Sequence, residues 1–265
     1  MPAATMPPAS PRPAYRVTGL RVARSEWAKL WSLRSSWITL TAALLVLLVM
    51  GVFTASGYDR PQPGTDMIDA VLVGVQFAQL AAGVLGVLVS AGEYTTGMIR
   101  STMCAVPTRL PVLWSKCLVY GAVALILATA GALAAFLLGG QVIGNQDLAL
   151  SLGDDGVLRC LVGAGLYLAL VAVLGVALGA LVRNSAGGIA ALAGLLYILP
   201  GLTSVLPDSW ADEVTPYLPS KAGAAVMQLH QTANSLEPWT GLAVFAGWTV
   251  LALAAAAWRL VHTDV

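Results

Sequence analysis

One polar stretch interrupts an otherwise very apolar chain, and it reads GEYTTGMIRSTMCAVPTRLP over residues 92–111. Apolar runs flank it on both sides, each at least as long as the roughly 20 residues that a transmembrane helix needs. Few helix breakers occur within its first half, Pro107 ends that half, and Thr108 can cap a following helix that tolerates Pro111 in its first turn. The stretch therefore predicts a short helix over residues 96–105, at a membrane surface between two spans.

The spacing of this short helix assigns its faces. The residues expected to face the membrane are Ile99, Met103 and Val106. The residues expected to face the cytosol are Thr96, Arg100 and Ser101. Glu93 lies at the end of the preceding span, and we expect it to pair with Arg100. The alternative is a solvated elbow that only joins two spans.

The composition requires a lipid environment. Hydrophobic residues make up 58% of the 265 residues and charged residues 10%, with a mean hydropathy of +0.79. A soluble domain carries about 25% charged residues, so this chain lacks the polar groups to cover a soluble surface. The net charge of +1 argues against a nucleic-acid partner.

Six apolar runs are long enough to cross a membrane. They are residues 37–56, 67–91, 115–139, 157–182, 186–206 and 239–258, with Pro200 breaking the fifth. We expect residues 36–265 to form a single six-span domain. The predicted fold is an all-α integral membrane protein.

The N-terminal segment has two predicted parts. Residues 1–19 are rich in proline and are expected to form a disordered cytoplasmic tail. Residues 20–35 are expected to form an amphipathic helix in the membrane interface. Its expected apolar face holds Leu20, Ala23, Trp27, Leu30 and Trp31, and its polar face holds Arg21, Ser25, Lys29 and Ser32. An ordinary solvated helix is the alternative.

The distribution of charge predicts the topology. With the N-terminus inside, eleven lysines and arginines fall on inner segments and three on outer segments, Arg60, Arg159 and Lys221. The eleven are Arg12, Arg16, Arg21, Arg24, Lys29, Arg34, Arg100, Arg109, Lys116, Arg183 and Arg259. Because positive charge accumulates on the cytoplasmic side, both termini are expected to be cytoplasmic.

Residue types needed for catalysis are scarce. His230 and His262 are the two histidines, on opposite predicted surfaces, and the three cysteines lack metal-site spacing. The sequence contains no H-E-x-x-H, no G-x-S-x-G and no phosphate-binding loop of the G-x-x-x-x-G-K-[ST] type. We therefore expect no catalytic residues, no metal and no cofactor on this chain, so any energy from ATP must enter through another polypeptide.

Small and polar residues mark particular spans. Glycines at helix-packing spacing are Gly83, Gly86, Gly175, Gly179, Gly187, Gly188 and Gly194; they predict close packing within the monomer, with a subunit interface as the alternative. The polar and bend residues expected to border a translocation path are Gln76, Gln79, Tyr197, Pro200, Thr203 and Ser204. The alternative is that neighbouring helices simply satisfy these buried groups. Within the outer segment 207–238, a helix is expected over residues 222–231, as a buried cap, a re-entrant pair or a loose loop.

Two motifs carry a resemblance to a known family. Ser25-Glu26-Trp27-x-Lys29-Leu30 precedes the first span, and Glu93-Tyr94-x-x-Gly97-Met98-Ile99-Arg100 follows the second. In the context of six spans, from about Leu20 to the C-terminus, the chain resembles the permease subunits of ABC-2 type transporters. That resemblance implies a bacterial plasma-membrane exporter in which two permeases, identical or homologous, bind two separate ATPase subunits that hold ATP and Mg.

The resemblance also implies roles for particular residues. The short helix between spans two and three would be the cytoplasmic coupling helix, with coupling residues Glu93, Tyr94, Thr96, Gly97, Met98, Arg100 and Ser101. The interfacial helix would also contact the ATPase, through Glu26, Trp27, Lys29 and Trp31. The second and fifth spans would line the path. The alternatives are a secondary transporter without an ATPase, and a non-transporting immunity or adaptor protein in the membrane.

Overall fold

The computed structural model describes residues 18–58, 66–106, 108–143, 148–205, 207–232 and 234–263. Helices dominate these ranges, and none of the residues described forms a strand. The predicted N-terminal tail lies outside them except for Thr18 and Gly19, and Gly19 already begins the first helix. The all-α fold is thus confirmed.

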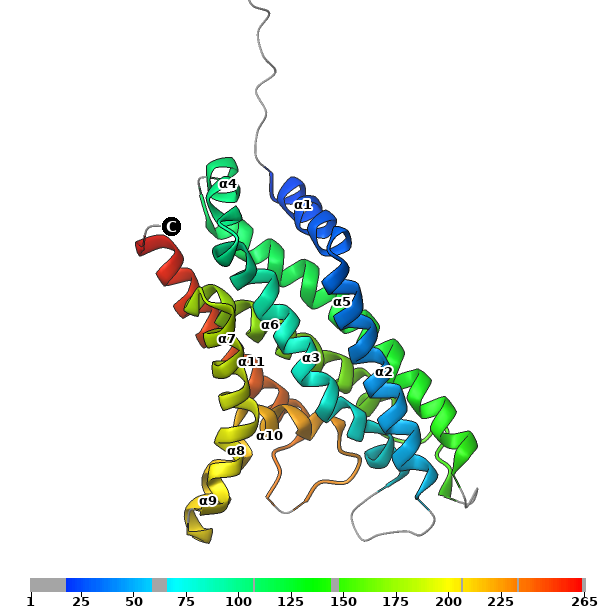
Figure 1. The fold of residues 1–265 in the computed structure, drawn as a ribbon. Helices are drawn as coiled ribbons and strands as arrows, with labels where there is room; N and C mark the ends of the chain where they lie inside the picture. Colours follow the sequence, from blue (N-terminus) through cyan, green and yellow to red (C-terminus); the bar gives the residue numbers. More distant parts are fainter. Residues whose placement is uncertain are drawn as a thin grey trace, which may run out of the picture.

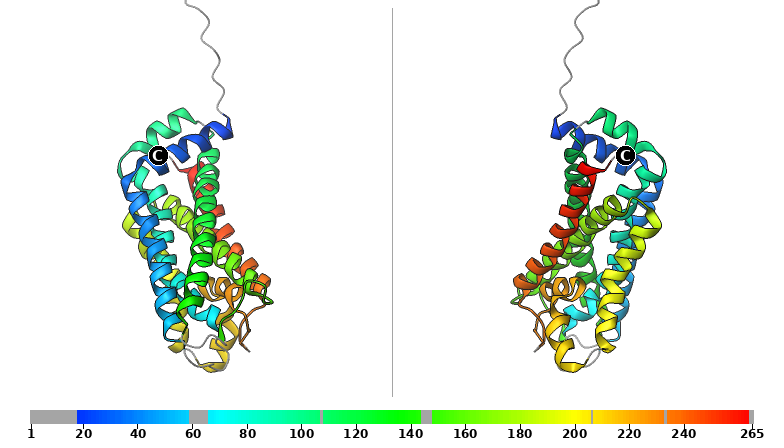
Figure 2. Two further views of the ribbon diagram at one scale, coloured as in Figure 1. Left: turned by 90° about the vertical axis from the view of Figure 1, so that its right-hand side faces the viewer. Right: turned by 90° about the vertical axis from the view of Figure 1, so that its left-hand side faces the viewer.

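Within the described residues, six helices are long and apolar enough to span a membrane, as predicted. The continuous ones are α2 (Arg34–Ser56), α3 (Met67–Thr95), α5 (Leu110–Val142), α6 (Val157–Val182) and α11 (Pro238–His262). The remaining span covers Ser185–Leu202 in three pieces. The long helices run side by side as one bundle, and two short helices, α1 (Gly19–Ser32) and α4 (Met98–Ala105), lie together at one end of it (Figures 1 and 2).

Glycine contacts pack α3 against α6 at the centre of the bundle. A Cβ on Gly175 would collide with the carbonyl oxygen of Gly83, and one on Gly86 with the carbonyl oxygen of Ala172. Gly179 lies equally close to the backbone of Val87. Because side chains are absent, the two backbones approach directly. These four glycines therefore pack within the monomer, whereas the same expectation is wrong for Gly194, where an added Cβ meets no atom within 4 Å.

Helix α5 begins earlier than the predicted third span. It starts at Leu110, and the N-cap is Arg109, at a φ of 54°, so the expectation that Thr108 would cap it is wrong. Pro111 does occupy the first turn, where its missing N–H has no helical partner to lose. Residue 107 lies outside the described residues. The early start places Lys116 nearly two turns inside the helix.

The fifth span is interrupted just before its proline. It consists of α7 (Ser185–Ala193), a π-helical turn (Gly194–Ile198) and α8 (Leu199–Leu202), and a 3-10 turn (Thr203–Val205) follows. Pro200 has no N–H to donate to the preceding turn, and the Leu199 amide reaches back five residues to the Gly194 carbonyl. The break predicted at Pro200 thus takes the form of a wide turn immediately upstream.

The segment after the fifth span folds back onto the bundle. It contains α9 (Asp208–Val214), a 3-10 turn (Thr215–Tyr217), α10 (Pro219–Ala224) and a second 3-10 turn (Ala225–Met227). The predicted helix over residues 222–231 is therefore wrong at both boundaries, because Pro219 starts the helix and the helical turns stop at Met227. Ala222 and Val226 are fully buried between α6 and α11, so this part is a packed cap and not a loose loop (Figure 1).

Candidate functional site

The short helix α4 is connected to α3 by a sharp turn. The amide of Thr96 donates to the carbonyl of Gly92 at 3.1 Å, and Gly97 turns the chain with a left-handed φ of 73°. Glycine adopts that conformation without the steric clash that a Cβ brings. The helix begins at Met98, two residues later than predicted, and ends at Ala105.

The apolar side of α4 packs on the protein. Ile99 is buried beside Tyr94, and Val106 is buried in a cluster with Val22 of α1 and Val112 of α5. The expectation that these side chains face the membrane is therefore wrong. Thr96, Arg100 and Ser101 are exposed, as predicted, and so are Gly97 and Met98. Tyr94 is half-buried, with the Arg183 guanidinium carbon 5.3 Å from its ring centroid.

The buried side of α1 differs from the predicted apolar face. It consists of Val22, Glu26 and Leu30, spaced four residues apart, whereas Leu20 is 66% exposed. Trp27 is exposed, and half-buried Trp31 packs against Trp37 with ring centroids 3.8 Å apart and the ring planes tilted by 51°. The prediction failed because it treated α1 as a helix resting on lipid, and Glu26 instead points into the bundle.

Four charged side chains from three helices meet beneath α1. The Lys116 ammonium lies 2.7 Å from Glu26 Oε2 and 2.7 Å from Glu93 Oε1. The Lys29 ammonium lies 2.7 Å from Glu26 Oε1 and 2.8 Å from Glu93 Oε1. We call Glu26, Lys29, Glu93 and Lys116 the ion cluster. It joins α1 to α5 and to the last turns of α3, and Lys29 also reaches Thr102 of α4 at 3.5 Å.

The ion cluster is neutral in sum and largely shielded from solvent. The side chains of Glu26 and Glu93 are each 4% exposed and that of Lys116 is 5% exposed, whereas Lys29 is 28% exposed. Burial by itself lowers the pKa of Lys29, but its hydrogen bonds to Glu26 and Glu93, and their negative charges, outweigh burial and raise that pKa above 10.5. Lys29 is therefore charged at neutral pH.

The predicted pair between Glu93 and Arg100 is wrong. Glu93 points back into the bundle toward Lys116, while Arg100 lies exposed on α4. The reason is geometric: the left-handed turn at Gly97 directs α4 away from the end of α3. Glu93 therefore belongs to the ion cluster, whereas Arg100 lies on the solvent-exposed surface of α4 at the same end of the bundle.

Arginines bind the C-terminal end of α11 at this same end of the bundle. Arg109 donates to the carbonyl of Leu260 at 3.1 Å, and Arg183 donates to the carbonyls of Arg259 and Thr263, each at 3.3 Å. Cations at a helix C-terminus satisfy its last carbonyls and its negative dipole end. The ends of α5, α6 and α11 on this side of the bundle are thereby connected next to α4.

Part of the predicted path forms a second polar group, deep in the bundle. Gln79 is buried, its side-chain amide donates to the Gln76 carbonyl at 2.9 Å, and the Tyr167 hydroxyl donates to its Oε1. The Tyr197 hydroxyl donates to the Gln76 carbonyl at 2.8 Å. This group connects α3 to α6 and to the π-helical turn of the fifth span.

Other predicted path residues lie apart from that group. Thr203 is buried, and its hydroxyl bonds locally to the carbonyl of Pro200 at 2.7 Å. Ser204 follows it in the 3-10 turn, and its side chain lies outside what the structure describes. The structure therefore joins three of the six predicted path residues and adds Tyr167.

A family model decides what kind of protein carries these features. The model for the ABC-2 family transporter protein matches residues 70–258, which is most of the chain. The chain belongs to the ABC-2 transporter family. Comparison with curated proteins gives no match. The matched range of this ABC-2 protein includes Glu93, α4 and Lys116 but begins after α1 and α2.

Family membership makes this ABC-2 protein a multi-pass membrane component of an ABC transporter. Among the described residues, no three histidine, cysteine or carboxylate side chains gather as a metal site. Cys117 and Cys160 are buried and Cys104 is exposed on α4, and all three are free thiols.

Two residues of this ABC-2 protein escaped sequence reasoning. Lys116 counted only as one more inner cation, although a lysine inside an apolar span requires a partner. Glu26 and Glu93 each stand next to a span, so a search for carboxylates at the same depth would have paired them with Lys116. Tyr167 carried no signal, because a tyrosine in a long apolar run looks the same whether it faces lipid or a buried amide.

Proposed function

We propose that this ABC-2 protein is the permease subunit of an ATP-driven exporter, coupled through α4 and α1 to separate ATPase subunits. The observation that carries the proposal is the ion cluster, which attaches α1 to the end of α3 just before α4 begins. Breaking it would leave buried charges uncompensated, which costs several kcal/mol. A force on exposed α4 or α1 is therefore passed to the spanning helices.

In this proposal the ATPase subunits bind ATP and Mg, and the permease carries no catalytic residue. Exposed Arg100, Ser101 and Met98 of α4 meet the ATPase, and Trp27 of α1 extends that contact. Closure of the ATPase pair around ATP shifts α4. Because α4 continues directly into α3 through Gly97, and Lys29 joins α1 to the same end, α3 moves with it.

The proposed path runs along α3 and the fifth span at the contact between two permease copies. Gln76 and Tyr197 are exposed in the isolated chain yet bonded to each other across these helices. Most of the fifth span is uncovered by the rest of the chain, including Ile198 and Leu202, so it has surface available for a second permease. Both identical and homologous second copies fit this surface.

The coupling proposal is tested by purifying the tagged chain from its native membrane and identifying co-purifying ATPase subunits by mass spectrometry. Arg100→Glu is expected to reduce ATPase recovery more than tenfold, because reversing a charge in a buried contact costs about 2–5 kcal/mol. Lys221→Glu is the matched charge reversal, at an exposed position of α10 toward the opposite end. Equal recovery with both variants contradicts the proposal. ATP-dependent substrate flux that survives collapse of ion gradients separates an ABC exporter from a secondary transporter.

The proposed topology, with both termini cytoplasmic in a bacterial plasma membrane, is tested with the native cysteines. Cys104 is exposed on α4, while Cys117 and Cys160 are buried, so Cys104 is the expected site of maleimide labelling. A membrane-impermeant maleimide is expected to label inverted vesicles and not intact cells. Cys104→Ser removes the signal and serves as the control. Labelling of intact cells would reverse the topology.

A further inference from the structure

A cavity of about 230 Å³ lies beneath α1, between α1, α3 and α5. Its polar wall holds the four members of the ion cluster, and its apolar walls include Leu30, Leu88 and Val119. The hydroxyl-bearing residues Ser35 and Ser36 lie on the side where α2 begins. We call this cavity the α1 pocket. It is large enough to hold a small polar group.

Glu93 lines the α1 pocket, and one of its carboxylate oxygens is buried and has no partner in the described part of the chain. Glu93 is 3% exposed, and its Oε2 accepts no hydrogen bond from the residues that the structure describes, although Oε1 accepts two. Lys116 cannot donate to Oε2, because all three N–H groups of its ammonium are used by Glu26, Glu93 Oε1 and the Val89 carbonyl. Lys29 likewise donates to Glu26, Glu93 and Thr102. Leaving a buried charged acceptor without a donor destabilises the folded protein. A hydrogen-bond donor from outside the chain would remove that cost.

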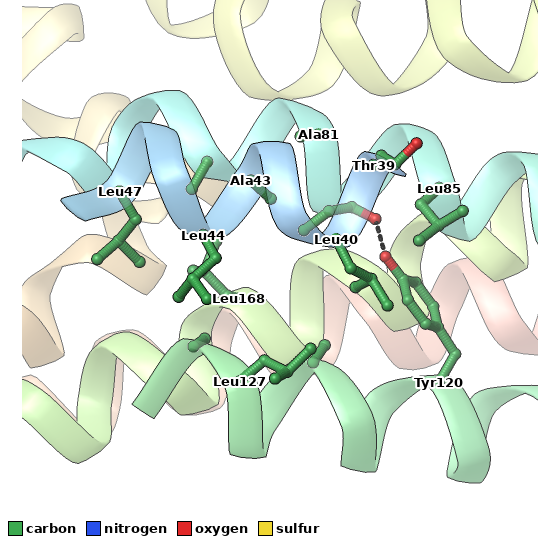
Figure 3. Close-up of a pocket in the computed structure, with 14 residues that line it drawn as sticks. Thr39, Leu40, Ala43, Leu44, Leu47, Ala81, Leu85, Tyr120, Leu127 and Leu168 are labelled. Atoms are coloured by element: carbon green, nitrogen blue, oxygen red, sulfur yellow. Dashed lines mark hydrogen bonds between the residues drawn. The ribbon is translucent and has the colours of Figure 1, made fainter. Parts of the chain in front are cut away.

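A separate apolar groove lies between α2, α3 and α5, and it shares Tyr120 with the α1 pocket. Leu40, Leu44 and Leu47 form its wall on α2, as Figure 3 shows, with Leu85 on α3 and Leu127 on α5. The groove is shallow, about 40 Å³, and its lining is almost entirely apolar. Tyr120 lines both cavities, and its hydroxyl is occupied by the Ala82 carbonyl at 2.6 Å. The α1 pocket, which Glu93 lines, thus adjoins an apolar groove that runs along a membrane span.

We propose that the α1 pocket binds the primary ammonium headgroup of a membrane phospholipid, with the ammonium donating to Glu93 Oε2 and an acyl chain lying along the α2 groove. The free group is an anionic acceptor, so it selects a cation that carries N–H protons. A quaternary ammonium has none, and the hydroxyl groups of an anionic phosphatidylglycerol headgroup are neutral donors, which bind a carboxylate less strongly than an ammonium does. Exposed Ser35 offers a hydroxyl donor to the lipid phosphate on the other side of the pocket.

This inference goes beyond the coupling proposal and does not depend on an ATPase. It concerns a lipid held in the isolated permease, and it is measured without transport or ATP hydrolysis. Failure of one proposal therefore leaves the other standing. The competing occupant is water, since a polar cavity of this size can hold several molecules that satisfy Glu93.

The test measures lipid retention by native mass spectrometry of the purified protein in micelles with equal amounts of phosphatidylethanolamine, phosphatidylcholine and phosphatidylglycerol. Phosphatidylethanolamine is expected to be retained about tenfold more than either other lipid, the ratio that one charge-assisted hydrogen bond supplies. Free ethanolamine, which lacks the acyl chains, is expected to compete only weakly. Equal retention of the three lipids, or no retention beyond bulk exchange, would mean that water fills the pocket and overturns the proposal.

Two glycine variants separate pocket occupancy from folding. A Cβ added at Gly92, which lines the pocket, meets no atom within 4 Å, so we expect the chain to tolerate Gly92→Phe and the ring to occupy pocket space. Gly247 of α11 also has no atom within 4 Å and lies away from the pocket, so Gly247→Phe is the matched control. We expect Gly92→Phe alone to abolish the preference for phosphatidylethanolamine. An unchanged preference in Gly92→Phe overturns the assignment to this pocket.

Glu93→Gln tests the chemistry of the bond. It keeps the shape of the side chain but removes the negative charge, so the preference for phosphatidylethanolamine over phosphatidylcholine is expected to fall about tenfold. Circular dichroism and gel filtration establish that the variant is folded. A folded Glu93→Gln protein with the original preference contradicts the proposed contact. If free ethanolamine displaces the lipid at equal concentration, the groove has no part in binding and the lipid source is wrong.

Discussion

Replacing Lys116 by methionine tests whether the ion cluster holds α1, α3 and α5 together. Methionine keeps most of the length and apolar stem of lysine and removes only the ammonium. That ammonium contacts Glu26 and Glu93, each at 2.7 Å, and the Val89 carbonyl at 3.2 Å. Without it, two buried carboxylates share the single remaining lysine of the cluster.

The structure sets the expected size of the effect. Removing one member of a buried ion pair costs about 3–5 kcal/mol, because the partner charge remains buried without compensation. Lys116 and both of its carboxylate partners are at most 5% exposed, so this range applies to Lys116→Met. Lys29 is 28% exposed and more strongly screened. Lys29→Met is therefore expected to cost about 1 kcal/mol or less, although it contacts the same two carboxylates.

A second substitution is expected to rescue the first. In Glu93→Gln combined with Lys116→Met, one negative and one positive charge are removed together, and Glu26 keeps its bond to Lys29. Replacing both members of a buried pair is often close to neutral. The double variant is therefore expected to recover at least about half of the stability that Lys116→Met loses.

The measurement is the free energy of unfolding in mixed micelles, followed by circular dichroism during titration with a denaturing detergent. Equal costs for Lys116→Met and Lys29→Met would show that burial does not decide the energetics of the ion cluster. A double variant less stable than Lys116→Met alone would show that the carboxylates are not strained by the missing ammonium. Either result refutes the reasoning.

Three further predictions follow from other parts of the structure. Gly97→Ala is expected to destabilise the protein by about 1–2 kcal/mol in the same unfolding assay, because the φ of 73° in the α3–α4 turn is strained for a residue with a Cβ. Its control is Gly92→Ala, at an ordinary helical position with open space, which is expected to be neutral or stabilising. Tyr167→Phe is expected to cost about 0.5–2 kcal/mol by leaving Gln79 Oε1 without its donor, and Tyr217→Phe, at an exposed tyrosine, is expected to have no effect. The pKa of Lys29 is raised in the folded protein, so the stability that its charge contributes is complete below pH 10.5 and is lost as pH rises through the higher folded pKa. The difference in unfolding free energy between wild type and Lys29→Met should therefore stay constant around neutral pH and vanish only in strong alkali.

The spans could be predicted because the membrane imposes a local rule. A helix crossing the hydrocarbon core needs about 20 apolar residues, and that requirement acts on each segment separately. The fourth span illustrates this: its predicted bounds, 157–182, coincide with α6. The third shows the limit, since α5 extends to Leu110, where the sequence is no longer continuously apolar. Its first turns are stabilised by contacts with α1 and α11, which no local pattern records.

The details of the candidate site depend on contacts between distant segments. Glu26 and Lys116 are 90 residues apart, and nothing in the sequence around either one names the other as partner. Amphipathic spacing assigned α1 to the membrane surface by its tryptophans, and the same spacing could not show that Glu26 would point inward. Pro200 did predict a break in the fifth span. The form of that break, a π-helical turn from Gly194 to Ile198, depends on how Tyr197 and its neighbours meet α3.

The position of α1 is therefore set by the bundle more than by lipid. A helix held only by the membrane interface would turn its apolar residues toward lipid and leave its carboxylates in water. In α1, Glu26 is buried against Lys116 while Trp27 is exposed to the surroundings. Separating α1 from α3 and α5 would expose or isolate these charges at a cost of about 3–5 kcal/mol, whereas moving the three together costs none of it. We therefore expect α1 and the adjoining ends of α3 and α5 to move as one body, so that a push on α4 reaches α3 through both the Gly97 turn and the ion cluster.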